Sequence, residues 1–387
     1  MPLKCGAIAV SVFHGRTFLT ELPLILDDRQ RQVTAVQQRL AGITPQRIAL
    51  IKPSALGDIA HTLSVVTALR QRFPLAELSW IVNTTYASLL ENHPDLDEVI
   101  TYDRSLMKKN FLGGIDYHAR FFRELRSRRF DMVIDLQGLL RSGLMVQATG
   151  AKWKLGLASA REGSRWFYNT ILPDDLWNMH AVDRYWLVAD VLGVGQQRKQ
   201  FKFPSLDAER NRWLAALASL PRPWVMMNLG TRWETKRWPV ESFAILGQHI
   251  TMTSSGSTIL VGGPDETELA EQYQQRWSRN VVSTVGKTNL RDLTALLSIA
   301  DLVISNDSGP LHLAVALGKQ VLSPFTCTSV TRTGPYGQPL GAVSTSVPCA
   351  ASYLKICSHM SCMNELSPTR LLPSLDTLLS TWQRYTA

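Results

Sequence analysis

Residues 47–74 read RIALIKPSALGDIAHTLSVVTALRQRFP, and this stretch decides the fold of the chain. The apolar run at 48–52 predicts a buried strand, and the amphipathic run at 58–72 predicts a helix. Turns between a strand and a helix often bind phosphate, because the first N–H groups of a helix are unpaired and carry partial positive charge. This turn instead places Asp58 where the helix begins, and it has neither a G-x-G-x-x-G nor a Walker pattern.

Two interpretations of Asp58 follow from its position. The first is that its side chain caps the helix. The second is that a carboxylate stands in a ligand cleft, ready to accept a proton from a hydroxyl group. A helix N-terminus favours the ionised form of an acid, which suits a base better than an acid. Spacing alone does not separate these two roles.

The alternation of strand-like and helical runs continues beyond this stretch and predicts βαβ units with parallel sheets. The first series has expected strands at 48–52, 78–82, 98–102 and 131–136, and expected helices at 58–72, 84–92, 117–128 and 181–192. The second has expected strands at 224–230, 258–263, 281–286, 301–307 and 320–325, and expected helices at 240–250, 265–277, 290–299 and 309–317.

These two series predict an α/β protein with two domains, at 47–215 and 222–367, joined near a Pro-rich segment. A final helix is expected within 368–387. Residues 1–46 form an N-terminal extension of unknown role, in which 27–40 could be a helix. Ligands of such sheets bind beyond the carboxyl ends of the strands, so two binding edges could face each other across a cleft.

Composition narrows the possible partners. The chain has 387 residues and a formal net charge of +9, which favours nucleic acid, an acidic membrane face or a phosphorylated substrate; a basic protein without a charged partner is the alternative. No nucleic-acid-binding motif accompanies the charge, so we expect no nucleic-acid partner. No apolar run of about 18 residues predicts a membrane span. Five cysteines, an odd number in a long chain, favour a reducing cytoplasm.

Two loops of the second series carry residues suited to a phosphorylated ligand. The loop after the strand at 224–230 contains Thr231, Arg232 and Lys236, and this cationic segment could bind a diphosphate; a solvated loop is the alternative. The segment DLVISNDSGPLHLAVALG places four further candidates at a strand–helix turn: Asp307, Ser308, Gly309 and His312. The N–H groups of that helix end form an anion site, and Asp307 could face a sugar hydroxyl.

Other candidates have weaker signals. His312 taken alone is more often a structural histidine. Glu266, after TILVGG, either accepts hydrogen bonds from ribose hydroxyls or is an ordinary first-turn acid. Gln137, Arg141 and Arg161 follow strand and turn segments of the first series and suit an anionic acceptor, although surface arginines are common.

One cysteine-bearing loop is the candidate for a metal site. Cys349, Cys357 and Cys362 are spaced C-x7-C-x4-C with His359 between them, which lacks the tight pairs of a typical zinc site. Packed or free thiols are the preferred interpretation. We therefore expect neither a metal nor a cofactor.

At this point the residues resemble the lipopolysaccharide heptosyltransferases, the inverting enzymes of glycosyltransferase family nine, and most closely their type I branch. The likeness covers Arg47 to the C-terminus and rests on these blocks: KPSALGDIAHTL, DLQGLLRSGL followed by AREGSRWFYN and HAVDRY, GTRWETKRWP, SNDSGPLHLAVALG and CMNELSP. The resemblance implies the GT-B fold, in which two Rossmann-like domains face each other. It also implies ADP-L-glycero-D-manno-heptose as the donor, bound by the second domain without a metal.

The resemblance further implies roles for individual residues. Asp58 matches the catalytic base and Lys236 the lysine on the donor phosphates. The remaining matches are Thr231 and Arg232 in the donor loop, Glu266 on the ribose, Asp307, Ser308, Gly309 and His312 at the phosphate and sugar, and Arg141 and Arg161, with Gln137 beside them, at the acceptor.

The sequence thus predicts an inverting glycosyltransferase that moves heptose from ADP-heptose to an anionic glycolipid of the Kdo-lipid A type. We expect it in the cytoplasm, in peripheral contact with the anionic face of the inner membrane, where basic surfaces are attracted. Two alternatives remain: a GT-B glycosyltransferase with another nucleotide-sugar or acceptor, and a non-catalytic protein that binds a nucleotide-sugar.

Overall fold

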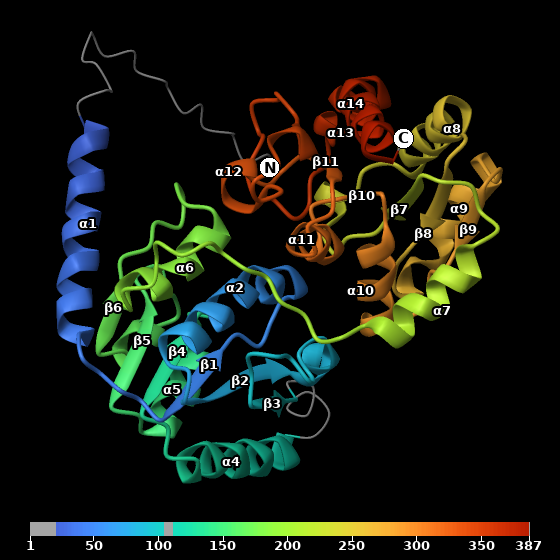
Figure 1. Ribbon diagram of the computed structural model, residues 1–387. Helices are drawn as coiled ribbons and strands as arrows, with labels where there is room; N and C mark the ends of the chain where they lie inside the picture. The colour runs from blue at the N-terminus through green and yellow to red at the C-terminus, as the bar shows by residue number, and fades with distance from the viewer. Residues whose placement is uncertain (1–20, 104–110, 387) are drawn as a thin grey trace.

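The computed structural model describes residues 21–103 and 111–386. Within them the chain forms two six-stranded sheets, ordered β3-β2-β1-β4-β5-β6 and β12-β11-β10-β7-β8-β9, and their recorded strand pairs are parallel. Both orders correspond to the doubly wound Rossmann pattern, because the third strand in sequence lies at one edge and the sixth at the other. Figure 1 shows the first half in blue to green and the second in yellow to red. The expected α/β fold with two facing Rossmann-like halves is confirmed.

The first half follows the predicted alternation and adds two short strands. Its strands are β1 (Arg47–Ile51), β2 (Glu77–Asn83), β3 (Glu98–Tyr102), β4 (Met132–Asp135), β5 (Trp153–Leu157) and β6 (Thr170–Leu172). Its helices are α1 (Glu21–Leu40), α2 (Leu56–Arg72), α4 (Phe111–Ser127), α5 (Leu140–Thr149) and α6 (Ala181–Val191), with 3-10 turns η1 (Thr84–Leu89) and η2 (Ser164–Phe167). The helix expected at 84–92 is wrong in type and length, because η1 ends at Leu89 and Asn92 adopts a left-handed backbone with φ 62°.

The second half repeats this plan. Its strands are β7 (Trp224–Asn228), β8 (Ser257–Leu260), β9 (Val281–Ser283), β10 (Leu302–Ser305), β11 (Val321–Phe325) and β12 (Ala342–Ser344). Its helices are α7 (Asp207–Leu217), α8 (Val240–Ser254), α9 (Thr267–Arg276), α10 (Leu290–Ile299), α11 (Gly309–Ala316), α12 (Val330–Thr333), α13 (Ser361–Glu365) and α14 (Pro368–Thr386). Helix α7 packs against α10 and therefore belongs to this half. Three 3-10 turns complete it: η3 (Glu234–Lys236), η4 (Pro264–Glu266) and η5 (Pro339–Gly341).

The central strands are mostly apolar because helices cover both faces of each sheet. Every residue of β7 and every residue of β10 is buried. Helix α14 packs against α8 and β11, and its Leu371 and Leu375 are fully buried in the core of the second half. In residues 21–103 and 111–386, no helix combines the length and apolar character that a membrane span requires.

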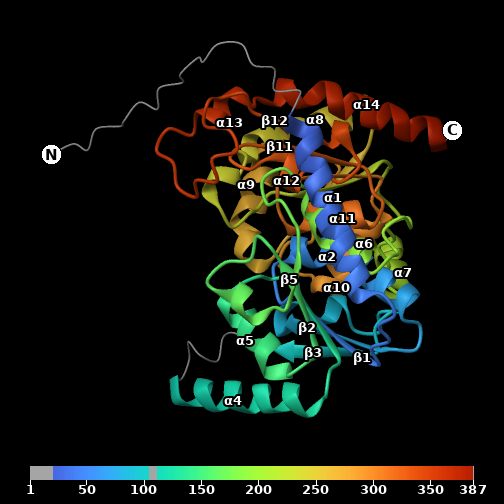
Figure 2. The ribbon, with the colours of Figure 1, turned by 90° about the vertical axis from the view of Figure 1, so that its left-hand side faces the viewer.

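Helix α1 packs against α6 and β6 of the first half, and Figure 2 shows it running along that side of the molecule. Its Val33 and Leu40 are 5% and 2% exposed and belong to the main apolar cluster. Arg39 Nη1 donates to the carbonyl of Asn169 at 2.5 Å. The helix expected at 27–40 is therefore present, and it covers part of the first half.

The two halves meet where α2 and α11 begin. Both helices have a glycine in the first turn: a Cβ on Gly57 would lie 2.4 Å from His312 Cδ2, and a Cβ on Gly309 would lie 2.8 Å from Leu56 Cβ. Hydrogen bonds also connect the two halves, including one between His180 Nε2 and the carbonyl of Gly334 at 2.9 Å. The chain itself passes from one half to the other in the segment between α6 and α7.

Candidate active site

A cleft of about 880 Å³ lies between the halves and is lined by residues of both. It is formed at the carboxyl ends of β1, β7 and β10, where the strand order of each sheet reverses and α/β proteins bind ligands. Nine of the site residues expected from the sequence line it: Asp58 from the first half, and Thr231, Arg232, Lys236, Glu266, Asp307, Ser308, Gly309 and His312 from the second.

Asp58 lies in the first turn of α2 and keeps 37% of its side-chain surface exposed. Its Oδ2 accepts a hydrogen bond from the backbone N–H of Ala55 at 3.3 Å, so it does cap the start of the helix. Its Oδ1 accepts a hydrogen bond from the Tyr185 hydroxyl at 2.7 Å. The carboxylate is thus held at two points while it lines the cleft.

Lys52 is the nearest cation to Asp58, with 3.6 Å between Nζ and Oδ2. Its side chain is only 3% exposed, and Nζ donates to the carbonyl of Leu136 and to the Tyr185 hydroxyl, each at 2.9 Å. Desolvation raises the pKa of Asp58, but the charge of Lys52 and the hydrogen bond from Tyr185 outweigh it, and the net pKa lies below the ordinary value. Burial in turn lowers the pKa of Lys52.

Lys236 and Asp307 form the corresponding ion pair of the second half. Lys236 Nζ donates to the backbone carbonyl of Asp307 and lies 3.3 Å from its Oδ2. Thr328 Oγ1 donates to the same Oδ2 at 2.7 Å, and His312 Nε2 lies 3.1 Å from Oδ1. Desolvation raises the pKa of Asp307, but His312 and Lys236 reverse the effect and bring it to about 2. Asp307 is therefore an ionised anchor for the loop that carries Lys236.

The N-terminus of α11 borders the same cleft. The Ser308 side chain makes no capping hydrogen bond to this helix; its Oγ donates instead to Asn228 Oδ1 at 3.0 Å. The helix end therefore presents backbone N–H groups that no Ser308 cap occupies, beside the ammonium group of Lys236. An anionic group fits such a position.

Glu266 lies at the ends of β7 and β8, between two glycines. A Cβ on Gly230 or on Gly262 would lie 2.0 or 1.9 Å from its carboxyl oxygens, so a side chain at either position would displace the carboxyl group from this place. Asn228 Nδ2 donates to Oε2 at 3.0 Å. Burial, followed by the charge of Asp265, raises the pKa of Glu266 to about 7.

Thr231 and Arg232 complete the wall beside Lys236. The backbone carbonyl of Thr231 accepts a hydrogen bond from Arg237 Nη2 at 2.9 Å, and Lys236 Nζ lies 5.2 Å from the ring centre of Trp233. This loop therefore presents three cationic side chains at one side of the cleft, opposite the half that carries Asp58.

Comparison with known proteins identifies the family. The model of glycosyltransferase family 9 (heptosyltransferase) matches residues 118–363. The chain belongs to this family. It is 27% identical over 304 residues to the lipopolysaccharide core heptosyltransferase OpsX of Haemophilus influenzae, a match that covers 78% of this chain and 84% of the relative. It is 28% identical over 357 residues to lipopolysaccharide heptosyltransferase 1 of Pseudomonas aeruginosa, covering 86% and 98%.

Among solved structures, the Escherichia coli heptosyltransferase WaaC with ADP aligns with a TM-score of 0.68 at 24% identity, covering 86% of this chain and 99% of that one. The resemblance inferred from the sequence blocks is therefore correct, and the two-sheet architecture is the GT-B fold of these relatives. The protein is a glycosyltransferase of family 9.

The second cavity of this family 9 enzyme has about 220 Å³ and shares Asp58 with the main cleft. Gln137 and Arg161 line it, and Gln137 Oε1 accepts a hydrogen bond from the backbone of Ser54 at 3.4 Å. Arg141, in the first turn of α5, lines neither cavity. This cavity is also lined by Lys52, Arg184, Tyr185 and, from the second half, Arg332, none of which was predicted from the sequence.

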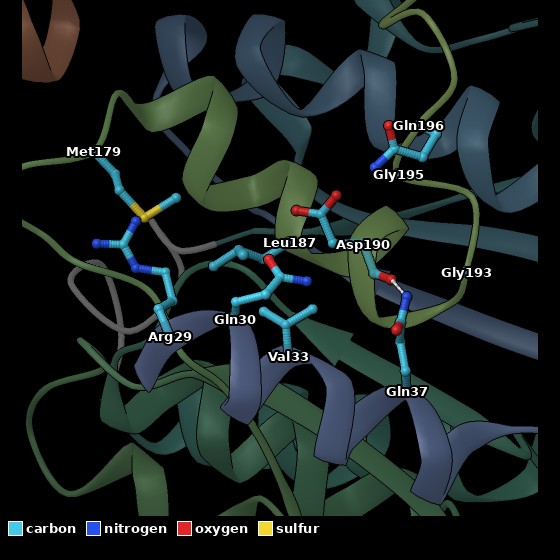
Figure 3. A pocket seen from close by; sticks show the side chains of 10 residues that line it. All are labelled: Arg29, Gln30, Val33, Gln37, Met179, Leu187, Asp190, Gly193, Gly195 and Gln196. Atoms are coloured by element: carbon cyan, nitrogen blue, oxygen red, sulfur yellow. Dashed lines mark hydrogen bonds between the residues drawn. The ribbon is translucent and has the colours of Figure 1, made fainter. Parts of the chain in front are cut away.

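A third cavity, of about 290 Å³, lies between α1 and α6, away from the predicted site residues (Figure 3). Arg29, Gln30, Val33 and Gln37 of α1 form one wall, and Gln37 Nε2 donates to the carbonyl of Asp190 at 2.7 Å. This cavity shows where α1 meets the family 9 fold, and it shares no lining residue with the cleft.

Four cysteines of the second half line one small cavity of about 20 Å³: Cys327, Cys349, Cys357 and Cys362. All four are free thiols. In the part of the chain that the structure describes, no three His, Cys, Asp or Glu side chains are placed to hold a metal ion. The sequence spacing did not indicate that Cys327 would join the other three.

Proposed function

We propose that the protein is an inverting heptosyltransferase that moves L-glycero-D-manno-heptose from ADP-heptose to the Kdo region of the lipopolysaccharide inner core. Membership of family 9 supports the transfer of a heptose. The names of the Haemophilus and Pseudomonas relatives support lipopolysaccharide as the acceptor. The solved WaaC structures, with ADP and with ADP-2-deoxy-2-fluoro heptose, support the donor.

The observation that carries the proposal is the placement of Asp58 and Lys236 on opposite halves of one cleft. In the proposed reaction, an acceptor hydroxyl gives its proton to Asp58 while its oxygen attacks the anomeric carbon. The bond from that carbon to the donor phosphate breaks, and ADP leaves from the opposite face. A single displacement of this kind inverts the configuration at the anomeric carbon.

The second half stabilises the leaving group in this proposal. Lys236 and the N–H groups at the start of α11 face the charge that develops on the diphosphate, which is the electrostatic part of catalysis. Glu266 accepts hydrogen bonds from the ribose hydroxyls. Thr231 and Arg232 border the phosphates. The proposal needs no cofactor, because the donor is a substrate and these groups meet its charge.

The smaller cavity beside Asp58 suits an anionic acceptor, since Arg161, Arg184 and Arg332 line it. We assign Gln137 and Arg161 to acceptor binding, and Arg141 to the approach of the acceptor from α5. A Kdo carboxylate matches the planar donor fork of an arginine. The net charge of +9 supports peripheral contact with the anionic cytoplasmic face of the inner membrane. Binding to anionic vesicles should then weaken as salt is added.

Mass spectrometry of products from ADP-heptose and Kdo-lipid A tests the function directly. A product heavier by one heptose, formed by the wild type and not by the Asp58→Asn variant, supports the proposal. If transfer occurs only with another nucleotide-sugar or another acceptor, the proposed substrates are wrong, but the proposed displacement with Asp58 as the base still applies. A thermal-shift panel of ADP-, UDP- and GDP-sugars identifies the donor in that case. Stabilisation by a nucleotide-sugar without turnover on any acceptor would instead indicate a binding protein.

A further inference from the structure

Lys52 is a buried cation at the end of a strand whose other inward residues are apolar. Burying an ammonium group costs free energy unless partners compensate for the lost water. Its Nζ has three close oxygen partners: the Leu136 carbonyl at 2.9 Å, the Tyr185 hydroxyl at 2.9 Å and Asp58 Oδ2 at 3.6 Å. An apolar side chain would complete the core of the first half equally well, so packing alone does not account for Lys52.

The donors and acceptors of the three side chains determine the direction of the hydrogen bonds that link Lys52, Tyr185 and Asp58. A lysine ammonium has only donors, so the Tyr185 oxygen accepts from Lys52. The single proton of the Tyr185 hydroxyl is then free to donate to Asp58 Oδ1, at 2.7 Å. The ionised carboxylate accepts that bond, and the arrangement Lys52→Tyr185→Asp58 has every donor facing an acceptor.

The same geometry orients the carboxylate. Tyr185 holds Oδ1 from α6, and the backbone N–H of Ala55 holds Oδ2 from the turn before α2. Rotation of the carboxylate would break both bonds. The exposed 37% of the Asp58 side chain is the surface that lines the cleft and the smaller cavity.

We propose that Lys52 and Tyr185 are positioning residues for the base: Tyr185 fixes the orientation of the Asp58 carboxylate, and Lys52 keeps it ionised. This inference rests on the proposed function, in which Asp58 takes the proton of the acceptor hydroxyl. After transfer, the neutral Asp58 carboxyl faces a buried ammonium group, which favours release of the proton to water. Lys52 thus acts on Asp58 both before the reaction and after it.

Other charged and titratable groups also face Asp58 or the cavities that it lines. In the first half they are His61 on α2, Tyr86 in η1, Arg161 before η2 and Arg184 on α6. In the second half they are Arg232, Lys236, Arg237, Asp265, Glu266, Glu268, Asp307, His312, Arg332 and Tyr353. Lys52 has the leading charge effect on Asp58, ahead of His312. Arg184 is engaged by Asp174 Oδ2 at 2.8 Å and Ser159 Oγ at 2.7 Å. We therefore assign the ionisation of Asp58 chiefly to Lys52.

The test measures the titration of Asp58 itself. Aspartate carboxyl carbons labelled with ¹³C are followed by NMR over a range of pH, and the Asp58 signal is the one missing in Asp58→Asn. The Lys52→Met variant should raise the pKa of Asp58 by about one unit or more, because a nearby opposite charge shifts a carboxyl group by 1–3 units. Tyr185→Phe should raise it less. Lys202→Met, which breaks the remote pair with Asp95, should leave it unchanged.

Kinetics give a second readout. At saturating substrates, the acid limb of kcat should move to higher pH in Lys52→Met and Tyr185→Phe, so that lost turnover is recovered as pH rises. Tyr185→Phe keeps the ring and its packing, and it serves as the informative variant if Lys52→Met does not fold. An Asp58 titration equal to wild type in Tyr185→Phe and in any folded Lys52 variant overturns the inference. Full turnover in Asp58→Asn would instead overturn the proposed base, whatever NMR reports.

Discussion

Gly57 and His312 belong to different halves of the molecule, yet a Cβ on Gly57 would lie only 2.4 Å from Cδ2 of the imidazole. The two residues lie in the first turns of α2 and α11, the helices that carry Asp58 and the backbone N–H groups at the edge of the cleft. The close approach of Asp58 to the N-terminus of α11 therefore depends on the absence of a side chain at Gly57. Gly309, which faces Leu56 in the same way, has the reciprocal role.

Replacing Gly57 with alanine should open the cleft. Alanine is intrinsically better in a helix by about 1 kcal/mol, so the local helix gains stability. The added Cβ nevertheless displaces His312 or the whole of α11, which should lower kcat and raise the donor KM. Small-angle scattering should show a larger radius of gyration than wild type. Adding His312→Ala removes the contact and should restore the scattering curve; an unchanged curve in Gly57→Ala would contradict the prediction.

Asp58→Asn should reduce turnover by about 10²–10⁴, the usual contribution of a general base. Asparagine keeps the shape of the side chain but cannot take a proton from the acceptor. ADP affinity should stay near wild type because the proposed donor site lies on the other half. Asp116→Asn is the matched control, since Asp116 lies on α4 with 62% of its side chain exposed. Equal turnover in the two variants would remove Asp58 from the mechanism.

Lys236→Met should lower kcat by about 10²–10³, the typical loss for one electrostatic stabiliser of developing charge. The reason is that the diphosphate loses its facing ammonium group. Steady-state kinetics with saturating acceptor measure the change, and the exposed Lys287→Met provides the control. A loss confined to KM, with kcat intact, would mean that Lys236 binds donor and transition state equally.

The same variant should alter acid stability through Asp307. The pKa of Asp307 is depressed to about 2, below its ordinary value of 3.8, so its ionisation stabilises the fold above pH 3.8. That contribution disappears as pH falls from 3.8 through 2. Without Lys236 the pKa of Asp307 rises toward its ordinary value, so the contribution is smaller and its loss is complete at a higher pH. Urea unfolding between pH 2 and 5 compares the two proteins; superimposable pH curves would refute the coupling.

Glu266 should make ADP binding depend on pH. Its pKa of about 7 means that the carboxyl group is largely protonated at pH 6, whereas ribose hydroxyls donate best to the ionised form. ADP affinity should therefore rise from pH 6 to 8, with proton release seen by calorimetry in buffers of different ionisation enthalpy. The phosphate of ADP titrates in the same pH range, so the proton release measured with the Glu266→Gln variant is subtracted as the contribution of the phosphate. Identical proton release in both proteins would exclude Glu266.

The raised pKa of Glu266 also affects folding, with the opposite sign to Asp307. The folded state holds its proton more tightly than the unfolded state, whose pKa is about 4.5. The favourable contribution is complete below pH 4.5 and is lost as pH rises through about 7. The free energy of unfolding of wild type should therefore fall relative to Glu266→Gln across this range, as urea titrations at several pH values would show.

Helix α1 should contribute to the stability of the first half. Leu40 is 2% exposed and packs in the main apolar cluster, so Leu40→Ala should cost about 2–5 kcal/mol of unfolding free energy. Gln38→Ala, at an exposed position of the same helix, should change it little. Equal free energies of unfolding for the two variants would show that α1 does not stabilise the first half.

Local patterns predicted what lies close together in the chain. The strand, turn and helix from Arg47 to Arg72 and the one from Leu302 to Ala316 match their expected places within two residues, because an apolar strand and an amphipathic helix leave distinct periodicities. Short strands such as β6 and β12, with three residues each, leave no period that can be recognised. The η1 turn was mistaken for a longer helix for the same reason.

Long-range partners could not be read from the sequence. Tyr185 lies 127 positions from Asp58 and 133 from Lys52, and the packing of α6 against α2 brings Tyr185 to both of them. Lys52 did leave one signal, a single cation directly after an apolar strand. The sequence gives no such signal for Arg332 or Cys327, because most of the residues that surround them in the cavities lie far away in the sequence.

The single passage of the chain between the sheets has an evolutionary consequence. The residues that line the smaller cavity, apart from Arg332 and Thr333, come before residue 193, and the residues that we propose to hold the nucleotide come after residue 206. One crossover in that segment would exchange an entire recognition module while keeping the other intact. New sugar donors and new acceptors can then be acquired in separate steps, by gene recombination rather than by point mutation alone.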